Sequence, residues 1–377
     1  MMRRVHLPIL TAVVLLAACD KKEILTGQRD EIPGVTAVDN TNPVGVAAVG
    51  AVNLTAPTVS SGYVDVSYNK QRNSPNHKTG KLNKLVWKSS LGRGPISSNI
   101  VAVGTSVFCI NANGKLVCLS QKDGRQLWEK DVAPQPDEAL FSGGMTANGE
   151  ILYITTNVCA VLAIDTKTQN ILWKRDIKYP LKGAPLYVAG KVIVTSVENH
   201  TYAINAKSGD IEWTMMASGE QTMMASSGTP AVYGDSVICP YSSGEIKSYN
   251  IHTGLLNWED ELVQTDVSKS GSTISHIVAP PVVFGRYALA ATPESKMVLY
   301  DVISGAAVWE RDVGVIYPPI ENSGSLFVLS EAGALLCLAT NNGAVRWRLD
   351  VKKIELEDDN TKSEDLQLFG PLLMNGN

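Results

Sequence analysis

The tryptophans of this 377-residue chain recur at nearly regular intervals. Successive tryptophans are separated by 41, 45, 40, 45, 51 and 38 residues, which gives a period near forty. A period of this length is typical of chains built from repeated supersecondary units that stack on one another. The spacing therefore predicts a repeat architecture from residue 82 onward. The repeating residues are Trp87, Trp128, Trp173, Trp213, Trp258, Trp309 and Trp347.

The residues before each tryptophan predict a strand, a tight turn and a second strand. One repeat runs from Asn205 through Ser208-Gly209 to Trp213, and the next repeats the pattern up to Trp258. An Asp or Asn at the end of a strand can accept hydrogen bonds from the backbone of the turn that follows. Five of the seven tryptophans have a glycine four residues earlier, where a positive φ is expected.

A second pair of strands precedes each motif. In one repeat, residues 185–188 and 191–194 are joined at Gly190, and similar segments recur at 230–239 and 281–290. Each repeat therefore contains four short strands, and a single unit of this kind cannot bury both of its faces. The chain is predicted to be all-β, with four-stranded blades arranged around an axis as a β-propeller.

The two ends of the repeat region bear on the number of blades. Residues 82–91 supply a lone strand with Trp87, whereas residues 370–377 begin a seventh repeat without continuing it. Propellers remove their open sheet edges by pairing strands from the two ends of the chain. We therefore predict an eight-bladed propeller that is incomplete at the C-terminus, lacking roughly 60–75 residues at this unit length. A seven-bladed ring lacking about 30 residues is the alternative.

The N-terminus has the form of an export signal. Arg3 and Arg4 precede an apolar run that is shorter than the roughly 20 residues needed to span a membrane. The run ends in Leu16-Ala17-Ala18-Cys19, which resembles the lipobox of bacterial lipoproteins and implies a lipid anchor on Cys19. An ordinary signal peptide is the alternative. The predicted divisions are a signal peptide at 1–18, a flexible tether without periodicity at 19–81, and the propeller at 82–377.

The composition does not favour a nucleic-acid partner, a metal site or catalysis. Charged residues make up 19% of the chain and the net charge is −4, so no basic surface for a polyanion is indicated. The acidic run at 355–359 lacks the ligand spacing of a calcium loop, and the histidines are isolated. We therefore predict no cofactor, no metal and no catalytic residue.

Most of the cysteines occupy positions where sister repeats have small apolar residues. Cys118 and Cys337 lie ten residues before a tryptophan, and Cys109 and Cys239 lie five residues after a hairpin glycine. We expect buried thiols there, and an exposed thiol at Cys159 in a turn. Cys109 and Cys118 are expected to share a sheet face, either as two core thiols or as a disulfide.

The tryptophan motif resembles the docking motif of pyrroloquinoline-quinone-type repeats over residues 82–377. Two groups of proteins share this motif: periplasmic quinoprotein dehydrogenases and the BamB lipoproteins of the outer-membrane β-barrel assembly machinery. The first resemblance would require adjacent cysteines and a calcium site, and the sequence has no Cys-Cys pair. The BamB resemblance implies a non-catalytic, lipid-anchored, monomeric scaffold on the periplasmic face of the outer membrane. Asp20 resembles an inner-membrane retention signal and leaves that membrane as an alternative.

The BamB resemblance also implies that loops between neighbouring blades bind the periplasmic POTRA domains of BamA. The corresponding loop here is 221–228, in which Met223 and Met224 are the candidate contacts. The next inter-blade loop, at 265–279, contributes Asp266. The family's arginine is replaced by Ala225, and packing of the two methionines under the rim is the alternative. Two other functions remain open: a propeller scaffold of another envelope complex, and a quinoprotein dehydrogenase.

Overall fold

The computed structural model describes twelve segments of the chain, and all of them belong to one compact unit, Val38–Asn377. The regular structure of these segments is β throughout, as predicted. Among them, no helix is long and apolar enough to span a membrane. The described segments are 52–58, 69–79, 85–91, 98–111, 113–132, 143–156, 159–181, 183–218, 228–262, 276–294, 296–351 and 368–374.

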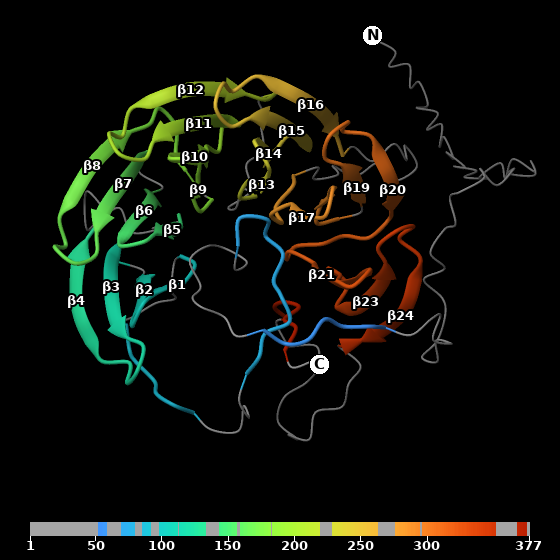
Figure 1. Cartoon of the computed structure of the whole chain (residues 1–377), viewed down its shortest axis with the longest axis horizontal. Helices are drawn as coiled ribbons and strands as arrows, with labels where there is room; N and C mark the ends of the chain where they lie inside the picture. Colours follow the sequence, from blue (N-terminus) through green and yellow to red (C-terminus); the bar gives the residue numbers. More distant parts are fainter. Residues whose placement is uncertain are drawn as a thin grey trace, which may run out of the picture. The chain divides into compact units, whose positions relative to one another are not determined.

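The strands form six four-stranded antiparallel sheets, each with its strands in chain order from the inner to the outer edge (Figure 1). The first three sheets are β1 (Val101–Val103), β2 (Ser106–Ile110), β3 (Lys115–Ser120) and β4 (Gln126–Asp131); β5 (Met145–Asn148), β6 (Ile151–Thr156), β7 (Ala160–Asp165) and β8 (Ile171–Asp176); and β9 (Leu186–Val188), β10 (Lys191–Thr195), β11 (His200–Asn205) and β12 (Ile211–Met216). The next three are β13 (Ala231–Tyr233), β14 (Ser236–Pro240), β15 (Glu245–Asn250) and β16 (Leu256–Glu261); β17 (Val282–Phe284), β18 (Tyr287–Ala291), β19 (Met297–Asp301) and β20 (Ala307–Arg311); and β21 (Ile320–Asn322), β22 (Ser325–Leu329), β23 (Ala334–Ala339) and β24 (Val345–Asp350).

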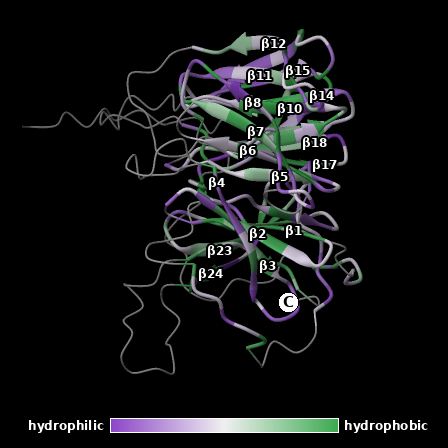
Figure 2. Cartoon of the chain, turned by 90° about the vertical axis from the view of Figure 1, so that its left-hand side faces the viewer, coloured by the Kyte–Doolittle hydropathy of each residue, from purple (hydrophilic) through white to green (hydrophobic). Residues whose placement is uncertain are grey.

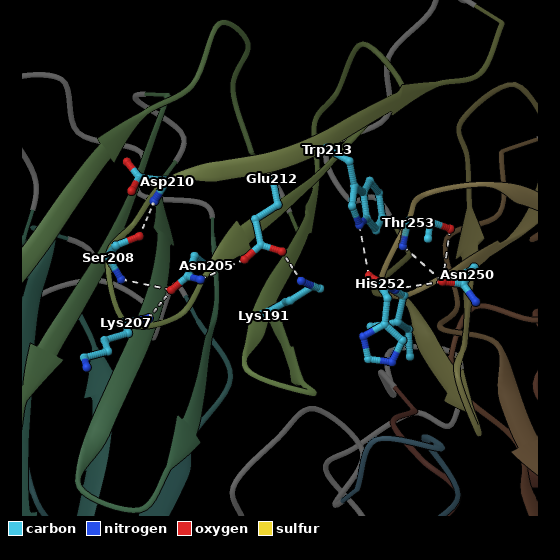
Figure 3. Close-up of polar contacts among 11 residues, drawn as sticks. Lys191, Asn205, Lys207, Ser208, Asp210, Glu212, Trp213, Asn250, His252 and Thr253 are labelled. Carbon is cyan, nitrogen blue, oxygen red and sulfur yellow. Dashed lines mark hydrogen bonds and ion pairs between the residues drawn. The ribbon is translucent and has the colours of Figure 1, made fainter.

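The turn before each tryptophan has the hydrogen bonds that the motif predicts. The Asn205 Oδ1 atom accepts hydrogen bonds from the backbone N–H groups of Lys207 and Ser208, at 3.0 and 3.1 Å. Gly209 follows with a φ of 77°, in the left-handed region that favours glycine. Figure 3 shows this turn beside Glu212, which also pairs with Lys191.

Neighbouring sheets are joined by the indoles. The Trp213 Nε1–H donates a hydrogen bond of 2.9 Å to the Ile251 carbonyl in the next sheet's turn. Figure 3 shows the Trp213 ring beside His252 and Asn250 of this turn. The ring also lies against Gly254, where an added Cβ would be 3.0 Å from the indole. Equivalent bonds of 2.8–2.9 Å join Trp87 to Gln121, Trp173 to Ala206, Trp258 to Val302 and Trp309 to Thr340.

Hydrophobic side chains fill the space between successive sheets. Each of five main clusters of buried residues contains side chains from two consecutive sheets, such as Leu299 and Leu336 in the last pair. The middle strands are hydrophobic and the turns more polar, as the colouring of β10 and the loops shows (Figure 2). This packing confirms a propeller of four-stranded blades. The structure describes six blades, and the count of eight remains a prediction.

Parts of the segment predicted as a tether contact the propeller. Thr58 forms a parallel bridge with His77, and His77 forms another with Met374. At the last blade, Trp347 lines an apolar pocket of 360 Å³ together with Val52 and other residues from both ends of the chain. The described N-terminal and C-terminal segments therefore meet beside the same blade.

The burial of the four cysteines expected in the core is confirmed, but the expected exposure of Cys159 and the expected orientation of Cys109 are wrong. Cys109, Cys118, Cys239 and Cys337 are buried free thiols, and Cys159 is half-buried rather than exposed. The expected shared face for Cys109 and Cys118 is wrong. The register of β2 and β3 pairs Cys109 with Val117, one residue before Cys118, and a one-residue offset reverses the face of a strand residue.

Candidate partner-binding face

The candidate face lies at the rim where the chain passes from one blade to the next. The first predicted loop leaves β12 after Met216 and returns at β13, and the second leaves β16 and returns at β17. Met223, Met224 and Asp266 lie outside the described residues, as does Cys19. The structure does describe the residues from which both loops depart and to which they return.

The bases of the two predicted loops are bonded to each other. The Gly228 N–H donates to the Ile277 carbonyl at 3.3 Å, and the Ile277 N–H donates to the Tyr241 carbonyl at 3.2 Å. Gly228 has no room for a side chain, because an added Cβ would be 2.5 Å from the Pro240 ring. The described bases of the two loops therefore lie together beside the sheet β13–β16.

A buried network of hydroxyl groups supports this arrangement. The Tyr241 hydroxyl donates to the Tyr249 hydroxyl at 3.2 Å and shares a 2.7 Å hydrogen bond with Thr201 of the preceding blade. Burial raises the pKa of Tyr241 well above its ordinary value, and it raises those of Tyr249 and Cys239 to about 12. These groups are therefore protonated and neutral at physiological pH. They support the loop bases through hydrogen bonds and carry no charge.

The departure of the first loop is held by Glu245. Its carboxylate accepts hydrogen bonds from the Ser218 N–H at 2.7 Å and the Ser243 hydroxyl at 2.6 Å. Burial alone would raise the pKa of Glu245, but hydrogen bonds from Ser243, Lys247 and Ser218 outweigh burial and hold it below its ordinary value. Glu245 is therefore ionised at neutral pH.

Asn199 joins the turns of two neighbouring blades at this rim. Its amide donates to the Ser218 carbonyl at 2.7 Å, and its Oδ1 accepts from the backbone and hydroxyl of Ser242 at 3.0 and 2.8 Å. The φ of Asn199 is 57°, and Gly244 takes the same left-handed conformation in the next blade. Asn tolerates this conformation better than most side chains, so it supplies polar contacts that glycine cannot.

The departure of the second loop is acidic. Lys247 forms ion pairs with Glu245 at 2.9 Å and with Glu259 at 2.8 Å. Asp260 and Glu261 follow on the exposed outer strand β16, and Asp260 accepts a 2.8 Å hydrogen bond from the Tyr300 hydroxyl. Negative charge therefore exceeds positive charge where this loop leaves the sheet.

The sequence signals for these residues were partial. Glu245, Asn199 and Ser218 carry no motif of their own. Asn199 occupies the turn position that Gly244 holds in the next blade, and this equivalence is the sequence signal for a left-handed residue there. Across the described ranges, no group of three or more His, Cys, Asp or Glu side chains could hold a metal ion.

The fold and this rim define a class: a tryptophan-docked β-propeller whose candidate site is built from inter-blade loops on a rigid sheet. The comparisons with known proteins agree with that class. A family model described as outer membrane protein assembly factor BamB matches residues 76–140 and 112–349. These matches cover more than half of the chain, so the chain belongs to this family.

Individual relatives are distant in sequence and similar over most of their length. The outer membrane protein assembly factor BamB of Yersinia pestis is 22% identical over 272 residues, which cover 70% of this chain and 69% of the relative. The protein of the same description from Bordetella pertussis is 23% identical and covers 82% and 80%. The crystal structure of BamB from Moraxella catarrhalis matches with a TM-score of 0.60 at 17% identity, covering 68% and 76%. This structural match shows the fold.

Proposed function

We propose that the chain is a non-catalytic, lipid-anchored scaffold subunit of the outer-membrane β-barrel assembly machinery. In this proposal, it binds the POTRA domains of a BamA-type barrel protein through the loops between β12 and β13 and between β16 and β17. Family membership supports the assembly role, because the relatives are described as assembly factors. The observation that carries the binding site is the bond between Gly228 and Ile277, which brings the two loop bases together.

The hydrogen-bonded bases of the two loops reduce the free-energy cost of binding a partner. Ordering a loop on association costs binding free energy, and a preformed base reduces that cost. Glu245 and Asn199 hold one end of the first loop, and the Ile277 backbone links both loops to the sheet. In the proposal, Met223 and Met224 supply adaptable apolar contacts, and Asp266 adds to the acidic departure of the second loop.

We place the protein on the periplasmic face of the outer membrane, held by lipid on Cys19. The relatives' description as outer membrane assembly factors supports that membrane, whereas Asp20 keeps the inner membrane as an outcome of the test. Density-gradient separation of the two membranes, with Cys19→Ala as the control, decides between them. Recovery of the wild-type protein in inner-membrane fractions would contradict the outer-membrane location.

Affinity purification tests the partner. Tagged wild-type protein from detergent-solubilised membranes is expected to recover a BamA-type barrel protein, and recovery of a different envelope complex would contradict the proposal. The double variant Met223→Ala/Met224→Ala and the single variant Asp266→Asn are expected to weaken binding to purified POTRA domains. Ile303→Ala is the matched control, because Ile303 is 65% exposed but lies in a turn at the opposite end of the strands.

A further inference from the structure

A short N-terminal segment crosses the inner edges of successive blades. We name residues 69–73 the axial strap. Its Lys70 carbonyl accepts a 3.0 Å hydrogen bond from the Val232 N–H, and its Gln71 carbonyl accepts one of 2.7 Å from the Val283 N–H. Both donors are middle residues of innermost strands, β13 and β17. The blue segment in the centre of Figure 1 follows this path beside β17.

The strap continues to the blades on either side. The Asn73 Oδ1 accepts a 3.0 Å hydrogen bond from the Glu321 N–H in β21. In the other direction, the Lys70 ammonium lies 5.1 Å from the centre of the Tyr187 ring in β9, within range of a cation–π contact. Three residues of the strap, Lys70, Gln71 and Asn73, thus contact the innermost strands of four blades.

The strap meets the return points of both candidate loops. Consecutive carbonyls of Lys70 and Gln71 hold β13 and β17, and these are the strands to which the two loops return. The next residue of the strap, Arg72, is only 1% exposed, and its Nε–H donates a 3.0 Å hydrogen bond to the Pro230 carbonyl. Pro230 is the last residue before β13, so its carbonyl fixes the direction in which the first loop enters the sheet.

The shorter inter-blade connections are held in a different way. The connection after β8 forms a bridge between Leu181 and Ser196, and the connection after β20 forms one between Val315 and Ser330. Those bridges join each connection to the blade that follows it. The two loops of the candidate face instead return to β13 and β17, whose backbone N–H groups donate to carbonyls of the strap. The strands β9 and β21, to which the other two connections return, meet side chains of the strap, Lys70 and Asn73.

We propose that Arg72 is a positioning residue of the partner-binding face, which fixes the returns of both loops through the axial strap. This inference rests on the proposed function, because its consequence is a change in affinity for the POTRA domains. A buried guanidinium is expensive to desolvate unless it is hydrogen-bonded, and here it bonds to the base of a loop. Removing the guanidinium makes the segments by which the two loops enter β13 and β17 more mobile. A partner must then order these segments on binding, which weakens its affinity.

The test compares full-length Arg72→Gln with wild type by hydrogen exchange and by binding to purified POTRA domains. We expect faster exchange in peptides covering Gly228–Tyr233 and β17, unchanged exchange in β5, and binding weakened about tenfold. Arg72→Lys keeps a cationic donor and is expected to restore most of the affinity, and it also serves if Arg72→Gln does not fold. Arg311→Gln is the matched control, because it makes the same substitution at a guanidinium whose Nε–H donates a 3.0 Å hydrogen bond to the Gly343 carbonyl, and it should bind as wild type does.

The outcomes separate this inference from the function on which it rests. Wild-type affinity in Arg72→Gln, or faster exchange spread evenly over all blades, would overturn the positioning role and leave the proposed function intact. Equal weakening in Arg311→Gln would also overturn it, because the effect would then not be specific to the strap. Failure of the wild-type protein to bind POTRA domains would overturn the proposed function itself, and the inference with it.

Discussion

Replacing Gly254 by alanine tests whether indole docking stabilises the propeller. Gly254 has a φ of 75°, and an added Cβ would be 3.0 Å from the Trp213 ring and 2.9 Å from the end of Met215. A left-handed alanine costs about 1–2 kcal/mol, and crowding a packed site costs about 1–3 kcal/mol more. We therefore expect Gly254→Ala to lower the free energy of unfolding by about 2–5 kcal/mol.

Gly234→Ala in the same sheet is the matched control. Gly234 has a φ of 53°, but nothing lies within 4 Å of an added Cβ. It should therefore lose only the conformational part, about 1–2 kcal/mol. Urea unfolding followed by tryptophan fluorescence measures the free energy of unfolding of both variants. The slope of this free energy against urea concentration should be the same as in wild type. Equal losses in the two variants would refute the docking argument, because they would show that the close approach of the indole adds nothing.

Three further outcomes are expected. Trp213→Phe removes the hydrogen bond to the buried Ile251 carbonyl and should lower stability by about 1–3 kcal/mol in thermal or urea unfolding. Cys239 is buried with a pKa raised to about 12, so a thiol reagent at pH 8 should modify half-buried Cys159 first and Cys239 only after denaturation; early labelling of Cys239, located by mass spectrometry, would contradict this. The ionised Glu245 carboxylate stabilises the fold above pH 4.5, because its pKa in the folded protein is lowered. This stabilisation is lost as the pH falls through the lowered pKa. The stability difference between wild type and Glu245→Gln should therefore shrink in acid, and a difference that grows would contradict the assignment.

The repeat could be predicted from the sequence because its determinants are local. The Asn205 side chain, Gly209 and Trp213 all lie within nine residues, and each requires a specific conformation or contact. The same offsets recur in other repeats, so strands, turns and their order follow from the pattern. The face of Cys109 could not be predicted as reliably, because one residue of register reverses it.

The base of the candidate site depends on contacts that no local pattern encodes. Arg72 and Pro230 are 158 residues apart, and the strap has no periodicity, so its sequence indicated a tether. The bond between Gly228 and Ile277 likewise depends on how two blades pack. Charged and polar residues such as Glu245 look like ordinary surface residues in the sequence. Only their neighbours in space show that they bind the backbone at the base of a loop. Sequence could place the loops on one rim but could not show what supports them.

The contact between an indole and the next blade is repeated around the propeller. Five joints described above share one arrangement, in which an indole docks on a glycine and a carbonyl of the next blade, as at Trp213 and Gly254. The second blade has Gln169, also at a positive φ, in place of the glycine. Because the chemistry of these five joints is the same, a unit that carries them can be duplicated or deleted during evolution without creating a new interface. Gene duplication can therefore change the circumference of such a protein in steps of one blade, while sequence drift within each blade remains limited by the two joints it must make.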